Sequence, residues 1–110
     1  MRNLKLYLLL NSLVITSVTT AQQSSVYTHQ FSEFDRAEAL YNDRQFLAAQ
    51  LLFDQISQQT NDPELRADCA FYSASSALHL NQGNAANLAQ DFIANYPSST
   101  KLNQLYTEVA

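Results

Sequence analysis

The chain of 110 residues contains only one glycine and two prolines. These two residue types mark turns and loops, so their scarcity predicts few tight turns and long regular elements. Apolar residues make up 46% of the chain, which is sufficient for the core of one small domain. The composition therefore favours an all-α fold over folds that are rich in strands or loops.

The first 21 residues have the layout of a secretory signal peptide. Arg2 and Lys5 precede a mostly apolar run over residues 6–18, and small residues follow up to Ala21. This run is shorter than the roughly 20 apolar residues that a membrane-spanning helix needs. We therefore expect cleavage after Ala21, export to the periplasm or the cell envelope, and no stable membrane anchor in the mature chain.

The charge balance argues against two classes of partner. After residue 21 the chain carries four basic and ten acidic side chains, which leaves a net charge of −6 with neutral histidines. Binding to nucleic acid or to anionic lipid depends largely on Lys and Arg. The sequence therefore predicts neither a nucleic-acid partner nor a lipid surface as the binding target.

No recognisable motif for catalysis or cofactor binding occurs in the sequence. A single glycine excludes a Walker loop, a dinucleotide-binding fingerprint and a nucleophile elbow. His29, Cys69 and His79 do not have the spacing of metal ligands, and Cys69 is expected to be a small buried residue. We therefore predict that the chain is not an enzyme, has no catalytic residues and holds neither a metal nor a cofactor.

Helical periodicity begins after a polar segment over residues 22–30, which is predicted to be a tail. Apolar residues then recur every three or four positions, and they predict five amphipathic helices over residues 33–41, 46–59, 63–80, 85–96 and 100–110. The expected N-caps are Ser32, Asp62, Asn84 and either Ser98 or Ser99, and Gly83 is expected to take the left-handed conformation after the third helix. Because the links are short, consecutive helices are expected to be antiparallel neighbours.

An internal repeat distinguishes a stack of hairpins from a closed bundle of five helices. An offset of 39 residues aligns Phe46 with Ala85, Ala49 with Leu88, and Phe53 with Phe92. The same offset pairs Ala37 with Ser76, which are both small. Each unit then consists of a helix, a short turn and a second helix that carries an aromatic residue.

The two repeated stretches are AEALYNDRQFLAAQLLFDQI and ASSALHLNQGNAANLAQDFI, and the second ends in DFIANYPSS. They resemble the tetratricopeptide repeat (TPR) family, in particular units of bacterial envelope proteins. The resemblance covers residues 31–110 and implies antiparallel helical hairpins stacked as an α-solenoid of about two and a half repeats. An incomplete third repeat suggests the N-terminal piece of a longer protein. Arg44 and Leu88 depart from the glycine and the small residue expected at these positions, and the offset exceeds the usual ~34 residues.

The TPR resemblance implies a groove lined by the first helix of each hairpin, which would hold a peptide or a partner helix. The corresponding residues are Phe34, Glu38, Tyr41 and Asn42 in the first unit, and Ser73, Ala77, Leu80 and Asn81 in the second. Packing between hairpins is the other role open to Phe34 and Tyr41. Asn42 and Asn81 recur at the offset of 39, and they either contact the backbone of a ligand or are surface residues beside a loop.

Two functions follow as hypotheses from this pattern. The first is an exported protein–protein interaction scaffold of the bacterial cell envelope, whose partner is a protein or a peptide. The alternative is an accessory repeat module of a larger exported enzyme, whose catalytic domain would lie beyond residue 110.

Overall fold

A computed structural model describes residues 29–109, so the predicted signal peptide and residues 22–28 of the predicted tail lie outside the described residues. Residues from Ser32 onward form one compact unit, to which the following description applies. The described part of the chain contains helices and turns and no strand, which confirms the all-α prediction.

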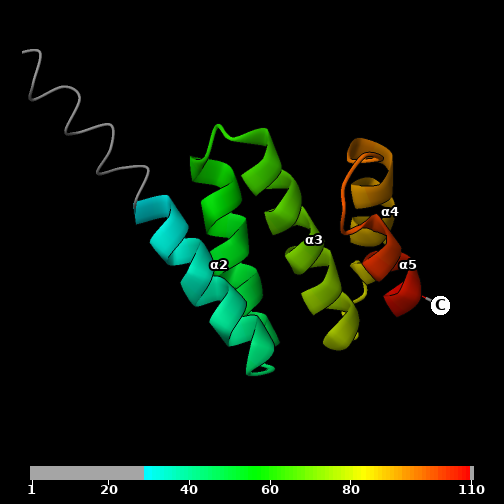
Figure 1. Ribbon diagram of the computed structural model, residues 1–110. Helices are drawn as coiled ribbons and strands as arrows, with labels where there is room; N and C mark the ends of the chain where they lie inside the picture. Colours follow the sequence, from blue (N-terminus) through cyan, green and yellow to red (C-terminus); the bar gives the residue numbers. More distant parts are fainter. Residues whose placement is uncertain (1–28, 110) are drawn as a thin grey trace, which may run out of the picture. The chain divides into compact units, whose positions relative to one another are not determined.

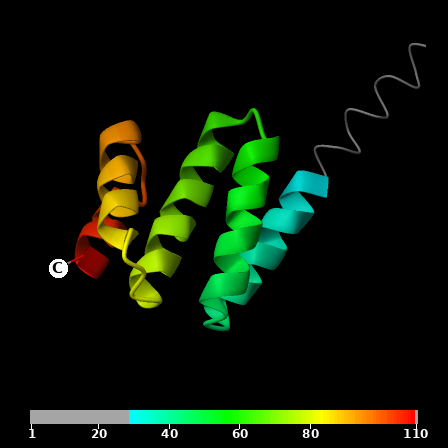
Figure 2. The same ribbon diagram turned by 180° about the vertical axis from the view of Figure 1, so that it is seen from behind.

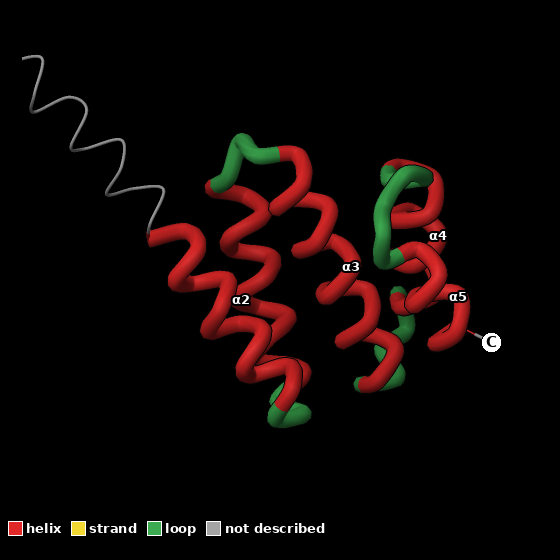
Figure 3. The backbone as a smooth tube through the Cα atoms, viewed as in Figure 1, coloured by secondary structure: helices red, strands yellow, loops and turns green. Residues whose placement is uncertain are grey.

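The helices follow one another with short connections. The chain is helical over residues 29–42, and it continues with α2 (Phe46–Gln59), α3 (Pro63–His79), α4 (Ala85–Asn95) and α5 (Leu102–Val109). Consecutive helices run in opposite directions, as Figures 1 and 2 show from two sides, and the connecting loops are coloured green in Figure 3. The helix over residues 29–42 and α2 are called the first pair below, and α3 and α4 the second pair.

Local polar side chains satisfy backbone donors at the beginning of α3, as the sequence predicts, and in the turn before α5. The Asp62 side chain accepts a hydrogen bond of 3.0 Å from the Glu64 backbone N–H, and Pro63 occupies the first turn of α3. Before α5, the Ser99 hydroxyl oxygen accepts a hydrogen bond of 3.1 Å from the Lys101 backbone N–H. Both bonds satisfy backbone donors that have no partner within a helix.

The other predicted helix signals are wrong in detail. Ser32 lies inside the helix over residues 29–42 and so does not begin it, and the Asn84 side chain makes no capping hydrogen bond at α4. Gly83 does not have a positive φ, whereas Arg44 (φ 62°) and Asn81 (φ 53°) do. The left-handed residue after α3 is therefore Asn81, two positions before the glycine that the sequence suggested.

Both left-handed residues belong to the same type of helix ending. After the first helix, the Gln45 N–H donates to the Leu40 carbonyl (2.9 Å) and the Arg44 N–H donates to the Tyr41 carbonyl (3.0 Å). The equivalent bonds after α3 run from Gln82 to Ala77 (3.0 Å) and from Asn81 to Leu78 (3.2 Å). This pair of bonds is the Schellman motif, in which the left-handed residue allows the last carbonyl groups of a helix to be satisfied.

The repeated ending changes the register of the internal repeat. Arg44 and Asn81 are equivalent and lie 37 residues apart, and the same offset relates buried Phe34 to Phe71. Buried Ala37 and Ala74 repeat it a third time. The offset of 39 is therefore wrong for the first helix of each pair, and Asn42 and Asn81 are not equivalent. The reason is the turn, because α2 begins two residues after Arg44 and α4 begins four residues after Asn81.

The core consists of two clusters that share one aromatic residue. The first contains Phe34, Ala37, Ala49, Phe53, Ile56, Leu65 and Cys69, and the second contains Phe71, Ala74, Ala89, Phe92 and Leu105. Tyr72 packs against both clusters. Its ring stacks on Phe53 with centroids 4.6 Å apart and lies edge-on to Tyr41 at 4.9 Å. Tyr72 thus joins the hydrophobic cores of the two pairs.

Candidate partner-binding surface

Three of the eight residues predicted to line a groove are buried. Phe34 retains 8% of its exposed area, Ser73 retains 7%, and Ala77 retains none. The Phe34 ring packs edge-on against Phe53, with centroids 5.6 Å apart. Phe34 therefore packs between helices, which is the second role that the sequence left open for it. All three side chains have little surface left for a partner.

Ser73 takes part in a set of polar contacts between α2 and the second pair. Its hydroxyl donates a hydrogen bond of 2.7 Å to the Asp54 carboxylate. Gln50 lies in α2, four residues before Asp54. Its amide group exchanges two hydrogen bonds, of 3.0 and 2.8 Å, with the amide group of Gln82, which follows α3. Gln50 is buried, so these bonds satisfy polar atoms that water cannot reach.

The remaining predicted residues keep part of their surface. Asn42, Leu80 and Asn81 are exposed, and Glu38 is half-buried. Tyr41 is also half-buried. Glu38, Tyr41 and Asn42 lie in the helix over residues 29–42, and Leu80 and Asn81 lie in the turn that follows α3. These five residues are the part of the predicted set that a partner can still contact.

Tyr41 connects three helices through its hydroxyl group. The hydroxyl oxygen lies 2.6 Å from the Ser75 hydroxyl in α3, and the Tyr41 O–H donates a longer bond of 3.4 Å to Glu108 Oε1 in α5. Burial raises the pKa of Tyr41, and the negative charge of Glu108 acts in the same direction. Tyr41 is therefore a neutral hydrogen-bonding group at physiological pH.

The sequence prediction included Tyr41 but missed Ser75 and Glu108. Glu108 lies three positions after buried Leu105, so helical spacing places it near the packed side of α5. That spacing was a usable signal. Ser75 sits in a stretch of small residues that offered no comparable signal, because every position in the stretch suited close packing.

Neighbouring serines in α3 are expected to respond to alanine substitution with opposite signs. Ser75→Ala removes the shorter of the two hydrogen bonds of the Tyr41 hydroxyl and should lower the free energy of unfolding by about 1 kcal/mol. Ser76→Ala should raise it by about 1 kcal/mol, because the buried Ser76 Oγ has no hydrogen-bond partner within the described residues and alanine favours the helix. Urea denaturation followed by circular dichroism measures both values, and two changes of the same sign would contradict the expectation.

Aromatic and cationic side chains gather where the first pair turns. The rings of Phe46 and His79 are stacked, with centroids 4.2 Å apart and planes only 3° from parallel. The Arg44 guanidinium carbon lies 5.9 Å from the Phe46 centroid. The stack joins the start of α2 to the end of α3 and was not anticipated from the sequence, because His79 and Phe46 lie in different helical pairs.

Cys69 is buried, as the sequence predicts. The thiol keeps 1% of its exposed area, and burial raises its pKa to about 12. Thiolate is the reactive form. We therefore expect iodoacetamide to modify Cys69 at least roughly 100-fold more slowly in the folded chain than in urea at the same mildly alkaline pH. Mass spectrometry of timed samples measures both rates, and equal rates would show that the thiol is accessible.

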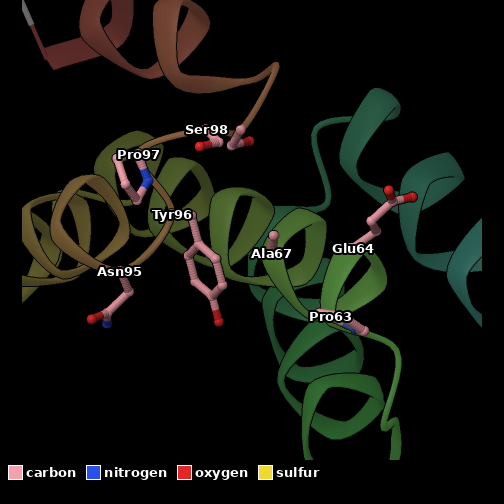
Figure 4. Close-up of a pocket in the computed structure, with 8 residues that line it drawn as sticks. Pro63, Glu64, Ala67, Asn95, Tyr96, Pro97 and Ser98 are labelled. Atoms are coloured by element: carbon pink, nitrogen blue, oxygen red, sulfur yellow. The ribbon is translucent and has the colours of Figure 1, made fainter.

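A cavity of about 350 Å³ opens between the beginning of α3 and the link from α4 to α5. Its lining residues are Pro63, Glu64, Ala67, Asn95, Tyr96, Pro97, Ser98 and Ser99. Figure 4 shows the Tyr96 ring extending from this link alongside Ala67, with Glu64 at the edge of the group. The sequence indicates a helix junction at Pro97 and the two serines, but it contains no signal for a cavity there.

Neither a metal centre nor a membrane-spanning helix is found in the part of the chain that the structure describes. Within residues 29–109, no group of three or more His, Cys, Asp or Glu side chains is placed to hold a metal ion. Comparison of the chain with protein-family models, with curated proteins and with solved structures finds no match.

Proposed function

We propose that the chain is an exported protein–protein interaction scaffold of the bacterial cell envelope, built from TPR-like helical hairpins. The observation that carries the proposal is the repetition of one structural unit. Both pairs end their first helix with the same left-handed residue and the same two backbone bonds, and both bury a phenylalanine and an alanine at equivalent positions. Repeated helical pairs that stack side by side characteristically present an extended binding surface.

The proposed contact surface comprises the last turn of the helix over residues 29–42 and the turn that follows α3. Its exposed members are Asn42 and Asn81, with Leu80 beside Asn81 and half-buried Glu38 one turn before Asn42. Two amide side chains can donate and accept hydrogen bonds with the backbone of a bound peptide, and Leu80 offers apolar area. A protein or peptide partner suits this chemistry better than a small molecule, because the exposed residues are spread over both pairs.

A pull-down from periplasmic extract tests this surface. The variant Asn42→Ala/Asn81→Gly removes both amide side chains, and glycine at position 81 tolerates the positive φ that asparagine adopts there. The matched control is Asn87→Ala/Asn103→Ala, which removes two exposed amides from α4 and α5. We expect a partner that is recovered with the wild type and the control but lost with the variant. Equal recovery with all three proteins would refute the proposed surface.

The export component has a separate test. The proposal requires the mature N-terminus to be Gln22, because cleavage is expected after Ala21. N-terminal sequencing of the protein recovered from a periplasmic fraction determines this position. An intact Met1 terminus on protein retained in the cytoplasm would refute export and leave the pull-down result to be judged on its own.

A further inference from the structure

We propose that the cavity between α3 and the α4–α5 link, called the Tyr96 pocket here, holds a long basic side chain, lysine or arginine, of a partner polypeptide. The Tyr96 pocket comprises the eight lining residues named above. It is distinct from the proposed contact surface that the pull-down tests, so the proposal stands independently of that surface.

The walls of the Tyr96 pocket suit the hydrocarbon part of such a side chain. Pro63 and Ala67 contribute apolar surface from α3, and Pro97 and the ring of Tyr96 contribute it from the opposite side. Lysine and arginine bury their methylene stems along apolar surface while the charged group remains at the edge. A volume of about 350 Å³ accommodates one such side chain and the water around its charged end.

The edge of the Tyr96 pocket suits the charged part. Glu64 lies in the lining, and no basic residue does. Two further carboxylates lie near Glu64: Asp62 caps the beginning of α3, and Asp68 follows Glu64 by four residues in this helix. Burial raises the pKa of Asp68; Lys101 opposes this shift, and the negative charges of Glu64 and Asp62 add to it. The local excess of negative charge therefore favours a cation.

The basic residues of this region are occupied elsewhere. Arg66 donates a hydrogen bond of 2.6 Å to the Thr60 carbonyl, and the Lys101 ammonium lies 4.9 Å from the Tyr72 centroid and 5.3 Å from the Phe71 centroid. Within the described residues, no basic side chain forms an ion pair with Glu64. Its carboxylate is thus available to a cation that another polypeptide supplies.

An anionic ligand is the opposing possibility, because the beginning of a helix carries partial positive charge. In α3 this end is already satisfied, since the Asp62 carboxylate accepts the Glu64 N–H and Glu64 adds a second negative charge in the first turn. The Tyr96 ring also favours a cation, which is attracted to the face of an aromatic ring. The Tyr96 pocket therefore combines apolar walls, an aromatic ring and a carboxylate, and these match a basic side chain.

A peptide titration followed by NMR tests the proposal on the full chain. The probes are the acetylated and amidated peptide Gly-Arg-Gly-Arg-Gly and its counterpart with citrulline, an uncharged analogue, in place of arginine. At low ionic strength, the arginine peptide should shift the backbone amide signals of Ala67, Tyr96 and Ser98, and the citrulline peptide should leave them unchanged. Glu64→Gln should weaken the binding of the arginine peptide about two- to fivefold, as expected for one exposed ion pair.

The matched control is Asp91→Asn, which removes the same charge from an exposed position in α4 and should leave the affinity unchanged. Tyr96→Leu, which retains apolar volume, should also weaken binding about twofold or more. Equal shifts with both peptides, equal weakening by Asp91→Asn and Glu64→Gln, or shifts only at Tyr41 and Asn42 would each overturn the proposal. The absence of any shift with the arginine peptide would overturn it as well.

Discussion

Tyr72→Ala is expected to lower the free energy of unfolding by about 3 kcal/mol. The substitution removes a ring that stacks on Phe53 at 4.6 Å and contacts Tyr41 and Phe34 edge-on, at 4.9 and 6.1 Å. It also removes one of the two rings that face the Lys101 ammonium. Because Tyr72 packs against both core clusters, the cavity should weaken both pairs of helices at once. Urea denaturation followed by circular dichroism measures the loss.

Two further variants serve as controls. One separates the contribution of the Tyr72 ring to the free energy of unfolding from that of its hydroxyl, and the other measures the effect of removing a tyrosine outside the core. Tyr72→Phe should cost less than about 1 kcal/mol, because the hydroxyl makes only a long hydrogen bond of 3.4 Å with Lys101. Tyr106→Ala should cost less than about 0.5 kcal/mol, since that side chain is 50% exposed. A loss for Tyr72→Ala as small as that for Tyr106→Ala would show that Tyr72 does not join the two clusters.

Leu105→Ala is expected to release α5 from the rest of the unit. The substitution should weaken the packing of α5 against the other helices by about 3 kcal/mol. Leu105 is fully buried in the second cluster, whereas its neighbours Tyr106 and Val109 are 50% and 53% exposed. A helix of 8 residues is too short to be stable in water without tertiary contacts. The α5 amides should therefore lose their protection against hydrogen exchange while the α2 and α3 amides keep theirs.

Val109→Ala is the matched control for this experiment, because it shortens an exposed side chain in the same helix and should leave the protection of α5 unchanged. Two results would contradict the expectation. One is that the α5 amides remain protected against hydrogen exchange in Leu105→Ala. This result would mean that the contacts of Lys101 and Glu108 hold α5 in place. The other is an equal loss of protection in all helices, which would mean that α5 does not open separately.

Two of the helices could be predicted from the sequence with good accuracy, whereas the first helix begins at residue 29, four positions before its predicted start. The predicted range of residues 46–59 coincides with α2, and the prediction for α3 differs by one residue at its end. These elements carry strong signals, since apolar periodicity defines the helix and Asp62 with Pro63 defines where α3 begins. The error at Asn81 has a physical cause. A glycine is preferred after a helix, but the closing backbone bonds decide which residue becomes left-handed, and those bonds involve residues 77 and 78.

The candidate surfaces could be predicted only in part. Periodicity identifies a face of a helix but not the neighbour that covers it, which is why Phe34 and Ala77 were placed in a groove although both are buried. The bonds of Tyr41 join residues that are 34 and 67 positions apart, and one sequence contains no direct record of such contacts. The cavity beside Tyr96 likewise depends on how α3 packs against a link about 30 residues away. The function in the cell envelope, export and the TPR relationship stay predictions.

The turns after Arg44 and Asn81 have a consequence for how repeats of this kind are recognised. Equivalent positions recur after 37 residues in the first helices, whereas Phe53 and Phe92 in the second helices are 39 residues apart. The chain therefore contains two interleaved periods, and a search that assumes one fixed period matches only half of each unit. The turn absorbs the difference, because it is two residues longer after Asn81 than after Arg44. A repeat search that allows a variable gap after the left-handed residue should detect further chains of this type.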